Sequence, residues 1–255
     1  MLIRAKFAFA ALACIAFDAQ AACGTQSGAN AVPLVELYTS EGCSSCPPAD
    51  RWLSKLALAD AGKANFLAFH VDYWDDIGWH DRFGSAAHGR RQRQRVASAE
   101  GGDTVYTPQV MVGSDVRVAW SEPQRFLATL KSATRPAGAS LSLRLQPARA
   151  ARWIASVDAG ATAPAPESQL WLAQYLDGQT TEVRAGENKG VTLRHDHVVN
   201  ELWGPWPLQG TDRQSRRVQV PSVSSPWGLI AFEQDRRGNT LQSLQLASAK
   251  CTAID

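Results

Sequence analysis

The sequence predicts an α/β domain over residues 31–134, followed by an all-β, sandwich-like domain over residues 139–250. The first prediction rests on two apolar runs separated by a helical pattern, an order typical of parallel strands joined by a helix. The second rests on segments in which apolar and polar residues alternate, as in antiparallel strands with one buried face. The boundary is placed at Thr134–Ser140, where Pro136 and Gly138 end the helical pattern.

The α/β domain is expected to begin with a buried strand at Val32–Tyr38, a run rich in apolar and β-branched residues. Apolar side chains at helical spacing predict a helix over Ala49–Asp60, and a second apolar run predicts a buried strand at Asn65–Val71. Residues 72–102 are interpreted as an insertion, which contains a loop rich in Trp and Asp and then an arginine-rich polar helix at Ser85–Ala99.

A hairpin and a helix are expected to complete the α/β domain. The hairpin pairs Val105–Val112 with Val116–Trp120, and the helix opens at Ser121–Gln124, whose Ser-x-x-Gln spacing is a capping box. In the all-β domain, strand patterns recur at Leu141–Leu145, Trp171–Tyr175, Trp227–Glu233 and Leu241–Ala247.

Composition bounds the class of protein. The chain has 255 residues, of which 45% are hydrophobic and 20% charged, so it can bury a sizeable core and global disorder is excluded. Lys and Arg number 26 against 24 Asp and Glu, for a net charge of +2. This balance gives no reason to expect a nucleic-acid partner.

Residues 1–21 have the order of a secretory signal peptide. A basic start precedes the apolar run Phe7–Phe17, and Ala19 and Ala21 provide small residues for cleavage. The run is too short to span a bilayer, so we predict no membrane span and a periplasmic or secreted protein. A lipoprotein signal ending at Cys14 is the alternative, but its apolar region would be very short.

The candidate site is the pair Cys43-x-x-Cys46, which lies between the first buried strand and the helix. Unsatisfied N–H groups and the dipole at a helix N-terminus favour a thiolate, so Cys43 is predicted to be the attacking cysteine. Cys46 lies one turn further along and would resolve the mixed disulfide. A static disulfide and half of a zinc site are alternatives, although the sequence has no second CxxC to complete a four-cysteine site.

Thr107-Pro108 is the second element of the candidate site. Proline in a sheet is disfavoured unless it begins a strand or is cis. A cis Pro108 would leave the backbone of Thr107 free to pair with an extended peptide, so both residues are predicted to bind substrate. An ordinary trans proline at the start of a strand is the alternative.

Together, these elements resemble the thioredoxin fold. Val35–Asp50, His70–Asp75 and Tyr106–Gln109 are similar to a family of secreted bacterial thioredoxin-like proteins known only as a domain of unknown function. Weaker similarities occur at Gly186–Asn188 and at His195-Asp196. The resemblance covers most of the chain after the signal peptide.

The resemblance implies roles for three residues. Cys43 matches the attacking cysteine, Cys46 the resolving cysteine and Pro108 the cis-proline. Ser44-Ser45 replaces the Gly-Pro of reductants and the Pro-His of strong oxidants, so the direction of electron transfer stays open.

Other residues are candidates for supporting roles. Glu36, in the first buried strand, is a candidate proton acceptor for Cys46, or else a structural ion pair with an arginine. Trp74 and Trp79 are expected either to wall a groove for a client protein or to pack within the insertion. His195 and His197 are interpreted as structural or exposed rather than as metal ligands, because two imidazoles do not fill a zinc shell.

Cys23 and Cys251 bracket the mature chain and are predicted to form a structural disulfide. Closing a loop of that length would stabilise the fold by roughly 5 kcal/mol in the chain-entropy model.

We therefore hypothesise an exported thiol–disulfide oxidoreductase that acts through Cys43 and Cys46 and needs no cofactor or metal. Its partners would be client proteins with thiols or disulfides, and a redox partner. Two alternatives remain: a Cu(I) carrier that uses the same thiolates, and a non-catalytic interaction protein.

Overall fold

The computed structural model describes residues 23–59, 63–99, 102–148, 152–161, 167–210 and 212–251. The expected signal peptide lies outside the described residues.

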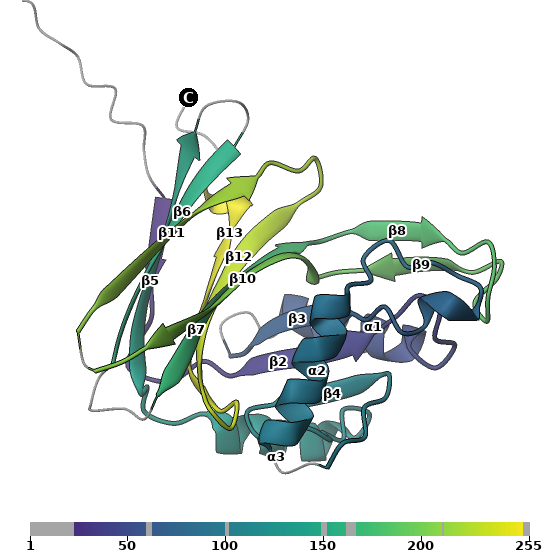
Figure 1. Cartoon of the computed structure of the whole chain (residues 1–255), viewed down its shortest axis with the longest axis horizontal. Coiled ribbons are helices and arrows are strands. Elements are labelled where there is room, and N and C mark those ends of the chain that lie inside the picture. Colours follow the sequence, from purple (N-terminus) through teal and green to yellow (C-terminus); the bar gives the residue numbers. More distant parts are fainter. Residues whose placement is uncertain are drawn as a thin grey trace, which may run out of the picture.

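A seven-stranded mixed sheet runs through the molecule, in the order β13-β12-β7-β10-β3-β2-β4 (Figure 1). Strand β2 pairs in parallel with β3 and antiparallel with β4. Every residue of β2 and β3 is buried, because helices and other strands cover both faces of this part of the sheet. The strands are β2 (Leu34–Thr39), β3 (Asn65–His70), β4 (Gln109–Val112), β7 (Ser168–Leu176), β10 (Val198–Leu208), β12 (Trp227–Asp235) and β13 (Thr240–Ala247).

The predicted fold class, an α/β thioredoxin-like domain followed by a separate all-β sandwich, is wrong. Most of the regular structure is strand, and the two halves of the chain share the seven-stranded sheet. The junction is at β10, which pairs in parallel with β3 at Val198 and Ala68, and the Ala68 amide donates to the His197 carbonyl over 2.8 Å. The sequence pattern of β3 predicts a buried strand but does not identify the strand that covers its edge.

The shared core also joins the two halves. Tyr38 and Phe69, from the first half, belong to the same buried apolar cluster as Trp171, Ile230 and Phe232 from the second. The boundary placed at Thr134–Ser140 therefore separates a helix from a strand, but the sheet and core continue across it.

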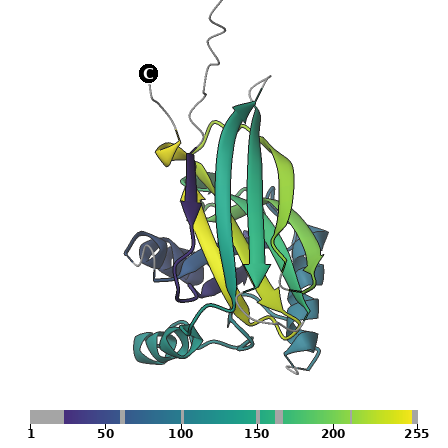
Figure 2. The same cartoon turned by 90° about the vertical axis from the view of Figure 1, so that its left-hand side faces the viewer.

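A four-stranded antiparallel sheet packs against the β7, β12 and β13 end of the large sheet, through leucines of both (Figure 2). Its order is β1-β5-β6-β11, with β1 (Cys23–Gln26), β5 (Ala139–Ala148), β6 (Arg152–Ala161) and β11 (Gln214–Pro221). A disulfide between Cys23 and Cys251 ties β1 to the turn η2 (Ser248–Lys250) near the chain end.

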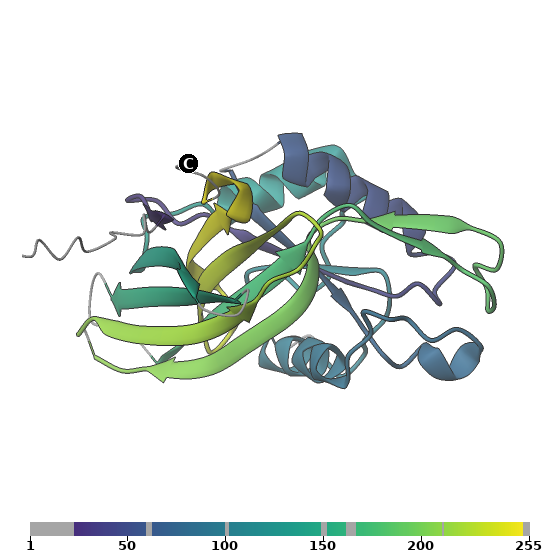
Figure 3. The same ribbon diagram turned by 90° about the horizontal axis from the view of Figure 1, so that it is seen from above.

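Three α-helices within the described residues cover the β2–β3–β4 region. Helices α1 (Pro47–Ala59) and α3 (Pro123–Ala133) share a core with one face of these strands. Helix α2 (Ala86–Ser98) packs on the opposite face through Val96 (Figure 3). None of the helices in the described ranges is both long and apolar enough to cross a membrane.

The remaining elements differ in part from the sequence predictions. The insertion at residues 72–102 contains a short 3₁₀ helix, η1 (Asp75–Ile77), before α2. The predicted hairpin forms only one strand, β4, whose partner arm at residues 116–120 is irregular. A two-stranded hairpin, β8 (Gln179–Glu182) and β9 (Thr192–His195), reaches from the β7 side of the sheet to α1 (Figure 1).

Candidate functional site

The CxxC pair lies where the chain passes from β2 into α1. Cys43 and Cys46 form a disulfide, with Cα atoms 5.4 Å apart. The Cys46 carbonyl accepts hydrogen bonds from the amides of Ala49 (2.9 Å) and Asp50 (3.1 Å), so Cys46 directly precedes the first helical turn. Proline at the first helical position, Pro47, suits this start because its missing N–H has no partner to lose.

The Thr107-Pro108 segment lies beside the disulfide. Its peptide bond is cis, and the Thr107 carbonyl accepts a hydrogen bond from Ser45 Oγ over 3.5 Å. The indole N–H of Trp74 donates to Thr107 Oγ1 over 2.8 Å. Of the two tryptophans expected to wall a groove, Trp74 thus belongs to this side of the site.

Trp79 lies on another side. Its indole N–H donates to Glu41 Oε2 over 2.9 Å, and it lines a hollow of about 460 Å³ together with Arg82 and Thr180. The structure therefore brings together Cys43, Cys46, Thr107, Pro108 and Trp74, and separates Trp79 from them.

Both sulfur-bearing residues are 0% exposed, although an attacking Cys43 would need to reach a client disulfide. The tip of the β8–β9 hairpin packs on the cysteine loop. Asn188 Nδ2 donates to the carbonyls of Glu41 (2.9 Å) and Cys43 (3.0 Å), and the Ser44 amide donates to Glu187 Oε2 over 3.1 Å. The weak tail similarity at Gly186–Asn188 thus includes two residues, Glu187 and Asn188, that hydrogen-bond the cysteine loop.

Glu36 is not positioned as the proton acceptor proposed from the sequence. Its Oε2 accepts from the Tyr38 hydroxyl and Arg91 Nε, and its Oε1 accepts from Arg95 Nε and Gln234 Nε2. Burial raises the pKa of Glu36, but the charges of Arg91 and Arg95 outweigh burial and lower it to about 2. The sequence reveals a carboxylate in a buried strand but not the two arginines of the insertion that neutralise it.

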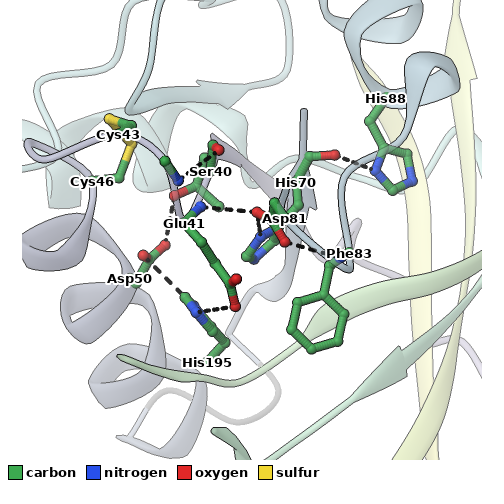
Figure 4. Close-up of polar contacts among 12 residues, drawn as sticks. Ser40, Glu41, Cys43, Cys46, Asp50, His70, Asp81, Phe83, His88 and His195 are labelled. Atoms are coloured by element: carbon green, nitrogen blue, oxygen red, sulfur yellow. Dashed lines mark hydrogen bonds and ion pairs between the residues drawn. A yellow bond between two sulfur atoms is a disulfide. The ribbon is translucent and has the colours of Figure 1, made fainter. Parts of the chain in front are cut away.

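A second buried polar cluster lies directly behind the disulfide (Figure 4). Asp50, one helical turn after Cys46, accepts a hydrogen bond from Thr39 Oγ1 over 2.9 Å, and its Oδ2 lies 3.7 Å from His195 Nδ1. The other ring nitrogen of His195, Nε2, lies 3.4 Å from Glu41 Oε1. His195 therefore stands between two carboxyl groups.

A histidine–aspartate pair adjoins this cluster. His70 Nδ1 lies 2.6 Å from Asp81 Oδ2, which also accepts from the Glu41 amide over 2.9 Å. The rings of His70 and His195 meet edge to face, with centroids 4.8 Å apart.

The charges of the cluster shift its pKa values in different directions. Burial raises the pKa of Asp50, and the neighbouring His195 and His70 only partly offset it. Burial also raises the pKa of Glu41, but contacts from His195 and Trp79 lower it by more. For Asp81 the charge of His70 overcomes burial and lowers the pKa to about 2, while Asp81 raises the pKa of His70.

Sequence reasoning missed this second cluster. Of the two interpretations left open for His195, structural or exposed, the exposed one does not hold, because His195 is buried at the site. His197 does not continue this strand, because β9 ends at His195 and His197 has a positive φ of 55°. One signal was available for Asp50, since residues four apart on a helix share a face and Asp50 follows Cys46 by four.

No group of three or more His, Cys, Asp or Glu side chains in the described part of the chain is arranged to hold a metal ion.

Comparisons with known proteins give a family and a fold. The profile of a family described as a protein of unknown function, DUF1223, matches residues 34–230. A crystal structure of a protein from Agrobacterium tumefaciens is 24% identical, with a TM-score of 0.64 over 88% of this chain and 98% of that one. HBP35 of Porphyromonas gingivalis is 12% identical, with a TM-score of 0.60 over 86% and 76%. These likenesses show the fold alone, and no curated protein matches.

Proposed function

We propose, for a chain that belongs to the DUF1223 family of proteins of unknown function, that it is an exported thiol–disulfide oxidoreductase. Its substrates would be protein thiols or disulfides, exchanged through Cys43 and Cys46. The export signal at residues 1–21 supports a periplasmic or secreted location. The order of strand, CxxC and helix is similar to that of thioredoxin-like proteins, and we propose a relationship for this segment only.

The observation that carries the proposal is the position of the disulfide, at the start of α1 with a buried carboxyl one turn below it. In the reduced protein, the first turn of α1 would favour a thiolate at Cys43, because its amides point toward the loop. Asp50 takes the place that the sequence hypothesis gave to Glu36. Burial raises the pKa of Asp50, the direction that favours its acting as a proton acceptor for Cys46.

The exchange step follows from these positions. In a mixed disulfide between Cys43 and a client, the Cys46 thiol gives its proton to the Asp50 carboxylate. The Cys46 sulfur then attacks the Cys43 sulfur, and the client sulfur leaves as a thiolate. Oxidation of the two cysteines thus balances the reduction of one client disulfide, and the reverse sequence oxidises a client.

Access to Cys43 requires the hairpin tip to move, because both sulfurs are covered. Among the described residues, two hydrogen bonds from Asn188 and one to Glu187 connect the tip to the cysteine loop. These contacts are few compared with those that hold a core strand, so a local opening is energetically feasible.

The test is the redox equilibrium of the purified protein with glutathione, which would also give the direction of electron transfer. We expect the Cys43–Cys46 pair of the wild type to equilibrate, and Cys43→Ser to lose all exchange while keeping its fold. The matched control is the Cys23→Ser/Cys251→Ser double variant, which removes the other disulfide and should still exchange. Equal exchange by Cys43→Ser and the wild type would refute the proposal.

The complete burial of Cys43 favours one rival, a non-catalytic interaction protein with a static disulfide. The two functions differ in how the disulfide is reduced. A catalytic disulfide should be reduced by dithiothreitol under native conditions, through local opening. A static one should be reduced only as fast as the whole protein unfolds.

A further inference from the structure

We infer that Asp50, His195 and Glu41 form a proton relay between Cys46 and solvent. The inference rests on the proposed function and deepens it, because it assigns the path by which the resolving cysteine loses and regains its proton. His195 is the central residue of this path, and it comes from the half of the chain that sequence reasoning assigned to a separate domain.

The pairing of the carboxyl oxygens is the first support. Each carboxyl group has one oxygen held by a neutral donor: Thr39 donates to Asp50 Oδ1, and Trp79 donates to Glu41 Oε2. The other oxygen of each group faces a different ring nitrogen of His195, at 3.7 Å and 3.4 Å. Neither of these two oxygens, nor either nitrogen of His195, has a well-formed hydrogen bond within the described ranges.

This arrangement is unusual for a structural histidine. Buried polar atoms are almost always hydrogen-bonded, and an unpaired one costs about 1–3 kcal/mol. Four such atoms follow one another here: Asp50 Oδ2, the two ring nitrogens of His195, and Glu41 Oε1. We interpret them as contacts that shorten or lengthen as protons move, rather than as a fixed network. The two ends of this series of groups also differ. Asp50 lies one helical turn from Cys46, whereas Glu41 lines a hollow.

The hollow provides the exit. It has a volume of about 460 Å³, is open to solvent and is lined by Glu41, Trp79, Arg82, Thr180 and Arg184. Glu41 itself is buried, and we assign this hollow as the route by which its proton reaches solvent.

The groups around this series include Asp81, His70 and Thr181, and two of their atoms, His70 Nε2 and Thr181 Oγ1, also lack a hydrogen-bond partner within the described residues. Asp81 faces Glu41 but is held by His70 and by the amides of Glu41 and Phe83. His70 also faces Asp50 and His195, and Phe83 packs its ring near His195. The His70–Asp81 pair thus supplies a fixed field, while the three relay groups are left to exchange protons.

Each proton transfer along the relay has a named donor and acceptor. Asp50 takes the proton from the Cys46 thiol and passes it to His195 Nδ1. The imidazolium gives its other proton, on Nε2, to Glu41, which releases it to water in the hollow. When Cys46 is reduced again, the same path runs in reverse, so the residues end as they began.

The test compares His195→Gln with His197→Gln in the full-length mature protein. His197 is a matched control because it is also buried, stacks on Tyr175 and pairs with Asp177 away from the disulfide. Reduced protein is mixed with oxidised glutathione in a stopped-flow instrument, and the plateau rate at saturating disulfide reports the attack by Cys46. The plateau rate is followed from pH 5 to 9.

We expect His195→Gln to lower the plateau rate by at least about tenfold near pH 7. Its rate should also depend more steeply on pH than that of the wild type, because Asp50 can then accept the Cys46 proton only after losing its own without His195. His197→Gln should stay within about twofold of the wild type with the same pH profile. Equal rates and profiles for the two variants would overturn the relay while leaving the proposed function in place.

A second measurement tests the relay if His195→Gln fails to fold or if the wild type does not exchange disulfides. In histidine-labelled wild type, the NMR titration of His195 should shift when the disulfide is reduced, and again in Asp50→Asn. An unchanged titration in both cases would refute the relay, whereas absent exchange with a shifted titration would refute only the proposed function.

Discussion

Two buried carboxylate clusters lie at β2 and just beyond it, and they differ in how completely they are paired. Each oxygen of Glu36 accepts two hydrogen bonds, from Tyr38 and Arg91 on one side and from Arg95 and Gln234 on the other. Beyond β2, the facing oxygens of Asp50 and Glu41 and both nitrogens of His195 lack a good partner in the part of the chain that the structure describes. We call the first cluster, in which both carboxylate oxygens are fully hydrogen-bonded, the finished network. We call the second, which has unpaired polar atoms, the unfinished cluster.

This difference separates structure from chemistry. A carboxylate held by two arginines is locked in one protonation state, so it stabilises the surrounding packing but cannot exchange a proton near neutral pH. A carboxyl group with a raised pKa and an unpaired oxygen has access to both states. A buried acid near a reactive cysteine is therefore judged better by its unpaired atoms than by its position in the strand.

The largest expected effect breaks the finished network. Arg91→Gln should lower the free energy of unfolding by about 3–5 kcal/mol, because it leaves Glu36 buried with one arginine fewer. Arg90 directly precedes Arg91 in α2 and is exposed, so Arg90→Gln should change the free energy of unfolding by less than about 0.5 kcal/mol. Urea unfolding at a constant m value measures both.

The pH dependence of this effect has a defined sign. Glu36 has a pKa lowered from 4.5 to about 2, so its stabilisation is present above pH 4.5 and is lost as the pH falls toward 2. The difference in unfolding free energy between Arg91→Gln and the wild type should therefore shrink as the pH falls from 4.5 toward 2. Exchange per folded molecule should be unchanged. A loss of exchange in Arg91→Gln would give Glu36 the chemical role that the comparison denies it.

The second prediction concerns the unfinished cluster. Asp50→Asn should slow disulfide exchange by about a hundredfold, since the proton acceptor for Cys46 is lost. The same variant should be more stable than the wild type at neutral pH. Burial raises the pKa of Asp50 above its ordinary value of 3.8, so the charged group destabilises the folded state increasingly as the pH rises from that value.

Unfolding free energies at pH 4 and pH 7 test this sign. The gain in Asp50→Asn should be larger at pH 7, whereas the exposed control Asp76→Asn should show no such trend. A variant that is less stable at pH 7, and exchanges normally, would place Asp50 with Glu36 among the structural carboxylates.

The sequence identified the local part of the site and missed the distant part, for a physical reason. Cys43, Cys46, Thr107 and Pro108 are recognisable because their spacing relative to strands and helices has a direct chemical meaning. The partners of Glu36 and Asp50 depend on tertiary packing. Arg91 lies 55 residues from Glu36, and His195 lies 145 residues from Asp50.

The same limit explains the error in the fold class. An apolar run predicts that β3 is a strand, but the sequence analysis places no strand at β10, and the hydrogen-bonding edges that join the two carry no side-chain signature. Once β10 is placed beside β3, the chain immediately before it brings His195 behind the cysteine loop. The error in topology and the failure to place His195 at the site therefore have one cause.

The smallest expected effect concerns the cover of the unfinished cluster. Asn188→Ala removes two hydrogen bonds to the cysteine loop, each with a net contribution of about 1 kcal/mol, and leaves the hairpin strands intact. The tip should open more often, so a small thiol such as dithiothreitol should reduce the Cys43–Cys46 disulfide several-fold faster under native conditions. Lys189→Ala, an exposed neighbour on the same tip, is the control and should leave this rate unchanged. If Asn188→Ala changes neither rate nor stability, the hairpin does not control access, and the burial of Cys43 must be relieved from the Trp74 side, where the indole contacts Thr107.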